Sequence, residues 1–142
     1  MSRDSTPSCR CPRPSKFSGP GFVALLISFD IDGTLEVGDP PGLISVGMVR
    51  ECKRLGHLIG SCSDRPVSYQ RQLWQRLDIA ADFTVLKHRL ADVKSQWPAE
   101  AYFHIGDTDL DHFFAGEAGF RFVRADATMR EAWGPSLFIT PP

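Results

Sequence analysis

Two carboxylates stand close together where an apolar run of the chain ends. The run is Val23–Ile27, and Asp30 and Asp32 follow it, with Gly33 next in the chain. In a doubly wound α/β sheet, ligands bind beyond the carboxyl ends of the strands, so carboxylates at this position are expected to contact a ligand rather than to pack in the core. Gly33 permits a turn that lets both face one site, although an Asp-Gly hairpin turn is the alternative. One carboxylate could attack phosphorus while its neighbour moves protons, which is phosphoryl-transfer chemistry.

Other polar groups follow three further strand-like runs of the chain. Because the carboxyl ends of parallel strands meet at one edge of a sheet, we expect these groups to surround the same crevice. They are Ser63 after residues 58–62, Lys87 after residues 82–86, and Gly106-Asp107 with Asp111 after residues 101–105.

This set of motifs resembles that of the haloacid dehalogenase-like superfamily of hydrolases, roughly over residues 23–124. The family's motifs are a DxDGT strand end, a Ser or Thr, a Lys, and a GDxxxD acidic loop. The first and last motifs are specific, whereas a lone Ser and a lone Lys carry weight only beside them. Dehalogenase members lack the second Asp of the first motif, so Asp32 favours phosphate chemistry over carbon-halogen cleavage. The matching residues are Asp30-Ile31-Asp32-Gly33-Thr34, Ser63, Lys87, and Gly106-Asp107 with Asp111.

The resemblance implies a Mg²⁺-dependent phosphatase that hydrolyses a phosphomonoester through an aspartyl-phosphate. Asp30 would be the nucleophile, and Asp32 the general acid and base. The Asp30 and Asp107 carboxylates and the Asp32 backbone carbonyl would hold Mg²⁺, a hard ion that takes oxygen ligands. Asp111 would hold a metal-bound water or orient Lys87. The residues expected to bind the substrate phosphate are Ser63, Arg65, Lys87, Gly33 and Thr34.

Two lysines compete for the third motif. Lys87 directly follows a strand-like run, on the proposed active edge. Lys94 lies within a predicted helix over 89–97, ~10 Å further along at ~1.5 Å per residue. This geometry favours Lys87, for which an ordinary solvated loop lysine is the alternative.

The serine and the acidic loop also have competitors. Ser61 should lie within its strand, whereas Ser63-x-Arg65 is similar to the family's Thr-x-Arg. Ser63 would donate a hydrogen bond to a phosphate oxygen, and Arg65 would make a bidentate phosphate contact or a salt bridge at the rim. Asp111 fits the GDxxxD spacing better than Asp109, and helix N-capping is the alternative role for both.

The order of strand-like and helix-like segments predicts an α/β fold. Strict alternation implies a Rossmann-like doubly wound sheet of about five parallel strands, with helices on both faces and right-handed crossovers. By resemblance the strand order would be 5-4-1-2-3. The strands are expected at 23–29, 57–62, 82–86, 101–105 and 120–124, and the helices at 45–56, 66–77, 89–97 and 109–118.

Apolar residues at helical spacing predict which helix faces are buried. The core positions expected from this spacing are Met48, Cys52 and Leu55 in one helix, and Leu110, Phe113, Phe114 and Ala118 in another. Gly119 stands where a helix-terminating glycine is expected.

Composition is that of a single compact domain. The 142 residues include 42% hydrophobic residues and carry a formal net charge of −1. This is enough for a core and offers no cationic patch for nucleic acid or a membrane surface. No run approaches ~18 apolar residues, so no membrane span is predicted. We interpret residues 1–20 as disordered, 21–133 as the hydrolase domain, and 134–142 as a C-terminal tail.

Cysteine and histidine usage indicates a cytoplasmic protein without a zinc site. Cys52 and Cys62 are expected to be free buried thiols, and no apolar stretch of about 7 to 15 residues precedes Gly19 as a signal peptide would require. The four histidines have no recurrent spacing. We interpret His104 as a strand residue and His112 as a helix-face residue.

The intervals between the motifs are too short for the cap domain that family members often carry. Residues 36–62 must hold a flap at 36–43, a helix and a strand, and residues 64–86 another helix and strand. A site without a cap is open, so we expect a bulky phosphorylated substrate or a homo-oligomer that closes the site. The motifs do not name the substrate.

Two other function classes compete with the phosphatase. One is a catalytically silent domain of the same fold that binds a partner or regulates it. Like charges repel, so a scaffold gains nothing by keeping Asp30, Asp32 and Asp107 together with a lysine. The other is a phosphoacceptor receiver domain, whose acceptor Asp would follow the third strand, where this chain has Lys87.

Overall fold

The computed structural model describes residues 24–126, in which strands and helices alternate strictly. The alternation and all the element bounds agree with the sequence prediction within two residues. A short 3₁₀ turn, η3, precedes the expected helix over 89–97, whose observed bounds differ from the predicted ones by one residue at each end. The elements are β2 (Leu25–Phe29), α1 (Val46–Arg54), β3 (Leu58–Ser63), α2 (Val67–Arg76), β4 (Phe83–Leu86), η3 (Lys87–Arg89), α3 (Leu90–Gln96), β5 (Ala101–Gly106), α4 (Asp109–Ala118) and β6 (Arg121–Arg124).

The terminal segments predicted at 1–20 and 134–142 lie outside the described residues. The same holds for the first and last residues of the predicted domain, 21–23 and 127–133.

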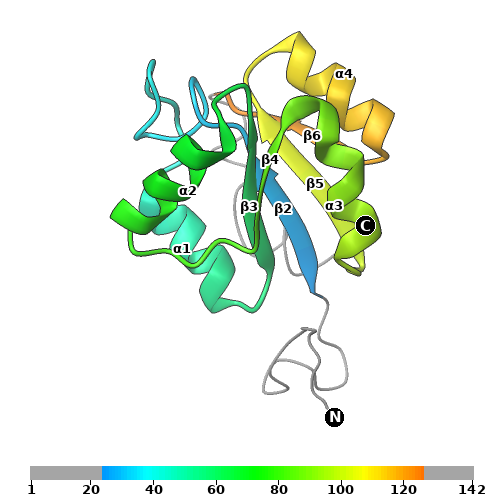
Figure 1. Ribbon diagram of the computed structural model, residues 1–142, viewed down its shortest axis with the longest axis horizontal. Helices are drawn as coiled ribbons and strands as arrows, with labels where there is room; N and C mark the ends of the chain where they lie inside the picture. The colour runs from blue at the N-terminus through cyan, green and yellow to red at the C-terminus, as the bar shows by residue number, and fades with distance from the viewer. Residues whose placement is uncertain (1–23, 127–142) are drawn as a thin grey trace.

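The five strands form one all-parallel sheet in the order β4-β3-β2-β5-β6. Numbered along the chain and read from the other edge, this is 5-4-1-2-3, the order that the resemblance implies. Figure 1 shows α1 and α2 on one side of the sheet and α3 and α4 on the other. The predicted doubly wound α/β fold is therefore confirmed.

Both faces of the central strand β2 are buried, so its residues alternate between two core layers. Ile27 packs in a cluster with Val49 of α1 and Trp74 of α2. Leu26 packs on the opposite face in a cluster with Val93 of α3 and Ala115 of α4. Because β2 is enclosed on both faces, its carboxyl end has a fixed position at the sheet edge.

The predicted core face of α1 is partly right. Cys52 is buried as expected, but Val49 is the other buried residue of this helix, and Met48 and Leu55 are only partly buried. Ser45 caps the helix by accepting a hydrogen bond from the Met48 N–H at 3.1 Å.

The predicted core face of α4 is right only for Ala118, which is buried as expected. Leu110 and Phe113 are 50% and 57% exposed, and Phe114 is half-buried. The buried residues of this helix are Asp111, Ala115 and Ala118, which recur at i, i+4 and i+7. Asp111 turns inward because its carboxylate bonds buried groups, and this sets the rotation of the helix. Gly119 ends the helix with φ +78°, as predicted.

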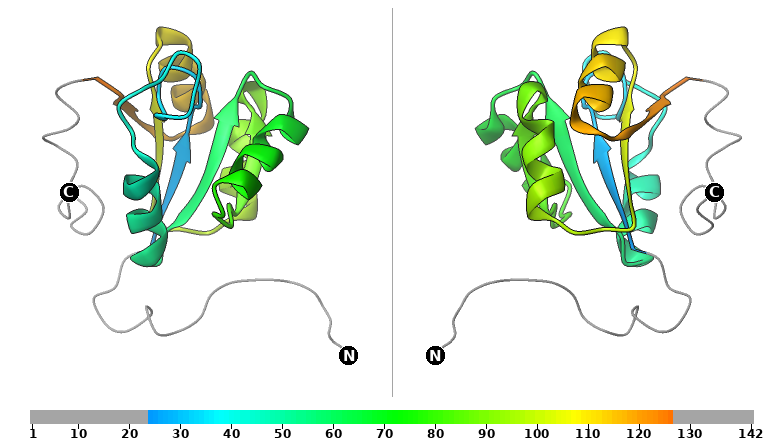
Figure 2. Two further views of the ribbon diagram at one scale, coloured as in Figure 1. Left: turned by 90° about the vertical axis from the view of Figure 1, so that its left-hand side faces the viewer. Right: turned by 90° about the vertical axis from the view of Figure 1, so that its right-hand side faces the viewer.

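The segment between β2 and α1 is a short flap rather than a cap domain. Leu35 and Ile44 form an isolated bridge that closes it, and the Ile44 N–H donates to the Thr34 carbonyl at 2.9 Å. Between β3 and α2 there is only the turn 64–66. In Figure 2 the flap, in cyan, and the start of α4 lie at the same end of the sheet.

Among residues 24–126, no helix has the length and apolar character needed to cross a membrane.

Candidate active site

The predicted polar residues meet at the carboxyl edge of the sheet. Asp30 directly follows β2, Ser63 is the last residue of β3, Lys87 directly follows β4, and Asp107 directly follows β5. Because these strands are parallel and hydrogen-bonded side by side, their ends stand in one row. The structure thus brings together four side chains that are far apart in the chain.

Three carboxylates of this edge lie close enough to share a cation. One oxygen each from Asp30, Asp107 and Asp111 lies within 4.8 Å of the others. Asp30 is 4% exposed and Asp111 is fully buried. Uncompensated negative charges this close repel each other in a buried setting, so a bound cation would relieve the repulsion.

Asp107 supplies a more specific indication of a cation site. Its Oδ1 atom is buried and has no hydrogen-bond partner among the described residues. A buried carboxylate oxygen without a hydrogen-bond partner destabilises the fold unless a bound ion or a water molecule contacts it. Gly33 makes room for this side chain, because a Cβ at its position, with φ +78°, would stand 2.0 Å from Asp107 Oδ2. The Asp30 and Asp107 carboxylates could therefore hold a hard metal cation.

Asp111 has no such spare capacity. Its Oδ1 lies 3.1 Å from His104 Nε2 and 3.2 Å from Lys87 Nζ. Its Oδ2 accepts hydrogen bonds from the Thr108 hydroxyl and N–H at 2.9 and 3.2 Å. Burial would raise the pKa of Asp111, but the hydrogen bond and charge of His104, followed by Lys87, hold it well below its usual range. Both carboxylate oxygens already have partners, so Asp111 is better placed to orient Lys87 than to bind a metal ion.

The same residue also caps α4. The Asp111 N–H donates to the Thr108 hydroxyl at 3.1 Å, and the Asp111 carboxylate accepts a hydrogen bond from the Thr108 backbone N–H at 3.2 Å. Capping and site roles therefore coexist at Asp111. The competing Asp109 is instead exposed and pairs with Arg124 at 2.7 Å.

Lys87 is the lysine at this site. Its Nζ lies 3.2 Å from Asp111 Oδ1, 3.9 Å from Asp30 Oδ1 and 3.6 Å from Asp64 Oδ2, and the side chain is 7% exposed. Burial would lower the pKa of Lys87, but the carboxylates of Asp30 and Asp111 raise it, so the ammonium is charged. Lys94 instead donates to the Gly119 carbonyl at 3.2 Å and lies over the Tyr102 ring.

Asp30 has an unusual proton affinity in the metal-free protein. Burial, followed by the negative charge of Asp111, raises its pKa to about 8, although Lys87 acts in the opposite direction. The Thr34 hydroxyl donates to Asp30 Oδ2 at 3.5 Å. A nucleophilic carboxylate must be ionised, so a cation that displaces its proton would activate it.

Asp32 is hydrogen-bonded to Arg65 and to the flap residue Asp39. Arg65 donates to it twice, from Nε at 2.8 Å and Nη2 at 3.2 Å, and the Asp39 N–H donates at 2.8 Å. Burial would raise the pKa of Asp32, but the hydrogen bonds of Arg65 and Asp39 hold it below its ordinary value. Of the two contacts predicted for Arg65, the structure contains the salt bridge. A proton-donating Asp32 must first leave this pair.

The two candidate serines have different surroundings. The Ser61 hydroxyl donates to Gln70 at 2.6 Å and accepts from the Trp74 ring N–H at 3.0 Å, within the core. Ser63 is at the active edge, and its hydroxyl accepts from the Arg65 N–H at 3.0 Å. The Ser63 hydroxyl proton is thus still available for a phosphate oxygen.

Gly33 and Thr34 stand at the site, but their amides are already bonded. The Gly33 N–H donates to the Pro40 carbonyl at 2.6 Å, and the Thr34 N–H donates to the Ile31 carbonyl at 3.2 Å. Their assignment to the phosphate stays a prediction, and for the Gly33 N–H it requires Pro40 of the flap to move.

Sequence reasoning missed the contribution of two buried polar residues. Ser28 of β2 and His104 of β5 are register partners, with Oγ and Nδ1 2.9 Å apart, and His104 also contacts Asp111. Each is a polar residue inside an otherwise apolar strand, and that isolation was the available signal. His104 is a strand residue, as predicted, but it also bonds directly to the candidate site.

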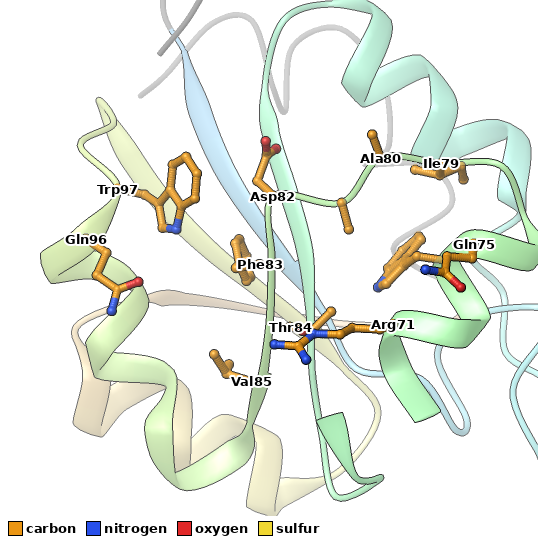
Figure 3. Close-up of a pocket in the computed structure, with 12 residues that line it drawn as sticks. Arg71, Gln75, Ile79, Ala80, Asp82, Phe83, Thr84, Val85, Gln96 and Trp97 are labelled. Atoms are coloured by element: carbon orange, nitrogen blue, oxygen red, sulfur yellow. The ribbon is translucent and has the colours of Figure 1, made fainter. Parts of the chain in front are cut away.

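A cavity of the described residues lies elsewhere. It has a volume of about 460 Å³ and flanks the outer edge of β4, between α2 and α3. Figure 3 shows Trp97 and Gln96 on one side of this strand and Arg71 on the other. It contains none of the carboxylates of the site, so it is not where the phosphoryl chemistry would occur.

No family model matches this chain, and no curated protein matches it either. The resemblance to the haloacid dehalogenase-like superfamily therefore rests on the motifs and remains a prediction.

Proposed function

We propose that this protein is a Mg²⁺-dependent phosphatase of the haloacid dehalogenase-like type, which hydrolyses a phosphomonoester through an aspartyl-phosphate. The observation that carries the proposal is the meeting of the Asp30 and Asp107 carboxylates, within 4.8 Å, beside the charged Lys87. Phosphoryl transfer needs a nucleophile, charge neutralisation on the phosphoryl oxygens, and a proton for the leaving group. Each of these has a named residue at this edge.

The metal would be held by the carboxylates of Asp30 and Asp107 and by the backbone carbonyl of Asp32. When bound, it would neutralise charge between the nucleophile and the phosphate. The unsatisfied Oδ1 of Asp107 supports this assignment. The four donors on Asp111 argue for an orienting role there instead.

The reaction would proceed in two steps. An Asp30 oxygen attacks phosphorus, the bond from phosphorus to the leaving oxygen breaks, and Asp32 gives that oxygen its proton. Asp32 then takes a proton from water, the water oxygen attacks phosphorus, and the acyl-phosphate bond breaks to release phosphate and restore Asp30. Lys87 would balance charge on the phosphoryl oxygens, and Ser63 would donate a hydrogen bond to one of them.

Asp32 must change its partners during this cycle. Its carboxylate is paired with Arg65, in the turn between β3 and α2, and that pairing lowers its pKa. A phosphate dianion also binds the planar guanidinium in a bidentate manner, so substrate would compete with Asp32 for Arg65. The released carboxyl could then take up a proton and act as the acid.

Hydrolysis of para-nitrophenyl phosphate with and without Mg²⁺ tests the proposal. We expect Mg²⁺-dependent turnover in the wild type and none in Asp30→Asn, while Asp92→Asn, which removes a carboxylate in α3, should retain full activity. Magnesium-dependent turnover retained by Asp30→Asn would refute the mechanism. If the wild type binds Mg²⁺ yet hydrolyses no member of a panel of phosphorylated sugars, nucleotides and peptides, the partner-binding domain becomes the better explanation.

A further inference from the structure

A chain of buried polar side chains runs from the interior of the sheet to Lys87. Ser28 Oγ lies 2.9 Å from His104 Nδ1, and His104 Nε2 lies 3.1 Å from Asp111 Oδ1. Lys87 Nζ lies 3.2 Å from the same Asp111 oxygen. Ser28, His104 and Asp111 are all 0% exposed. Three secondary-structure elements, β2, β5 and α4, thus contribute to a connection that ends at the candidate active site.

This chain is not a second nucleophilic site. Ser, His and Asp also make up the triad of many hydrolases, where the serine oxygen must reach a substrate carbonyl. Here Ser28 lies within the central strand and is 0% exposed, so no substrate can reach it. A buried, connected polar network of this kind instead rigidifies the groups that it joins.

We propose that His104 is a positioning residue, which fixes the Asp111 carboxylate so that Asp111 presents Lys87 to Asp30 and to the phosphate that Asp30 receives. The proposal rests on the phosphatase function proposed above. It gives His104 a role that neither its strand position nor the motifs assign.

The hydrogen-bond roles follow from the ionised state of Asp111. A carboxylate only accepts hydrogen bonds, so His104 Nε2 carries a proton and donates it. Thr108 fixes Asp111 Oδ2, and His104 fixes Oδ1. With both oxygens held, the direction in which Oδ1 meets the Lys87 ammonium is set.

Lys87 needs such a fixed partner because a second carboxylate, that of Asp64 at the exposed rim, competes for its ammonium group. A lysine is a compact charge on a flexible stem, and it follows whichever anion attracts it most. Asp64 lies 3.6 Å from Lys87 Nζ and is 77% exposed. If Asp111 lost its orientation, the ammonium could move out towards Asp64 and away from Asp30, which is 3.9 Å from it.

Two substitutions separate the hydrogen bonds from the ring's volume. His104→Phe keeps a planar ring next to Phe122, whose ring centroid lies 6.4 Å from that of His104, but it removes both hydrogen bonds. His104→Gln keeps an N–H group that can reach Asp111. Ser28→Ala removes only the hydrogen bond to His104 Nδ1, at the interior end of the chain, so it is the matched mild variant.

The test is a double-mutant cycle between His104 and Lys87. We expect His104→Phe to lower kcat/KM for para-nitrophenyl phosphate about tenfold or more in the wild-type background. In the Lys87→Ala background the same substitution should change kcat/KM less than about twofold, because a residue that acts through Lys87 has nothing left to position. Equal effects in both backgrounds would show a merely structural role and overturn the proposal.

A second measurement keeps the test decisive if a variant is unstable or too slow to assay. Calorimetric titration with inorganic phosphate in the presence of Mg²⁺ needs no turnover. It should show that His104→Phe weakens phosphate binding when Lys87 is present but has little effect in the Lys87→Ala background. His104→Gln should bind phosphate within about threefold of the wild type. If the Gln variant is as weak as the Phe variant, the hydrogen bond is not what matters and the proposal fails.

The two proposals fail in different ways. A wild type that hydrolyses no phosphate ester but binds phosphate with the predicted coupling would refute the phosphatase and retain the positioning role. An active wild type with additive effects at His104 and Lys87 would retain the phosphatase and refute the positioning role.

Discussion

Replacing Asp30 by Asn should stabilise the metal-free fold while it abolishes turnover. The carboxyl is 4% exposed and lies beside Asp111, so its ionisation is unfavourable in the folded protein. Its pKa is raised from 3.8 to about 8, with burial as the largest cause. The isosteric amide has the same shape and no charge, so folding with Asn at this position does not require a proton.

The sign and size of the effect follow from this pKa. Between about pH 4 and pH 8 the folded protein keeps a proton on Asp30 that the unfolded chain has released, so this group destabilises the fold increasingly as the pH rises. At ~1.4 kcal/mol per pH unit, the loss reaches a few kcal/mol by neutral pH. His57 acts in the opposite direction, because burial lowers its pKa to about 4. Both proteins contain His57, so their difference isolates Asp30.

Urea unfolding in EDTA at about pH 5 and about pH 8 measures this difference. We expect the free energy of unfolding of Asp30→Asn to exceed that of the wild type by at least about 1 kcal/mol more at the higher pH. Asp92→Asn should follow the wild type at both values. The reasoning is refuted if the Asp30 variant is the less stable protein at the higher pH, or if the difference does not depend on pH. Magnesium, which displaces the same proton, should bind the wild type more tightly as the pH rises towards about 8.

Three further substitutions, with Lys94→Ala as a control, test other parts of the site. Gly33→Ala should weaken Mg²⁺ binding about tenfold or more, measured by calorimetry, because its Cβ would stand 2.0 Å from a carboxylate oxygen of the site. Lys87→Ala should lower kcat/KM about 100-fold, whereas Lys94→Ala should leave it within about twofold and lower the free energy of unfolding by about 1 kcal/mol. Arg65→Ala should raise the pKa of Asp32 towards its ordinary value, because the main partner that lowers it is removed, and an NMR titration of the carboxyl measures this.

Each of these predictions has an outcome that would contradict it. Gly47→Ala is the matched glycine control, since the nearest atom to its Cβ would be 3.8 Å away. Equal magnesium affinities for the two glycine variants would show that Asp107 is not a ligand. A larger kinetic loss at Lys94 than at Lys87 would reverse the lysine assignment. An unchanged Asp32 titration would mean that the salt bridge is absent in solution.

The fold could be predicted because each local pattern agrees with the global arrangement. Apolar runs at Leu25–Phe29 and Ala101–Gly106 alternate with amphipathic helices, and such alternation has few solutions other than a parallel sheet. Polar residues placed just after the strands then had to share one edge. The positions of Asp30, Asp107 and Lys87 therefore followed from chain order and strand ends.

The rotation of α4 could not be predicted from apolar spacing. Leu110 and Phe113 fit the pattern of a buried face, yet they are exposed because the helix turns Asp111 inward. The four hydrogen-bonding and ionic contacts of that carboxylate come from three other residues, of which Lys87 is distant in the chain and His104 lies on another secondary-structure element. A periodicity argument counts apolar side chains and has no means of weighing a buried ionic network.

By itself, the amino-acid sequence determined the α/β class, the strand-end placement of the acidic motifs, and the preference for Lys87 over Lys94. Those features depend on short-range periodicity and on where a strand stops. Only the tertiary structure decided that Asp32 pairs with Arg65, that Asp107 has a free buried oxygen, and that His104 reaches the site. These depend on distances between residues remote in the chain, which are set when the core packs and each buried polar atom must find a partner.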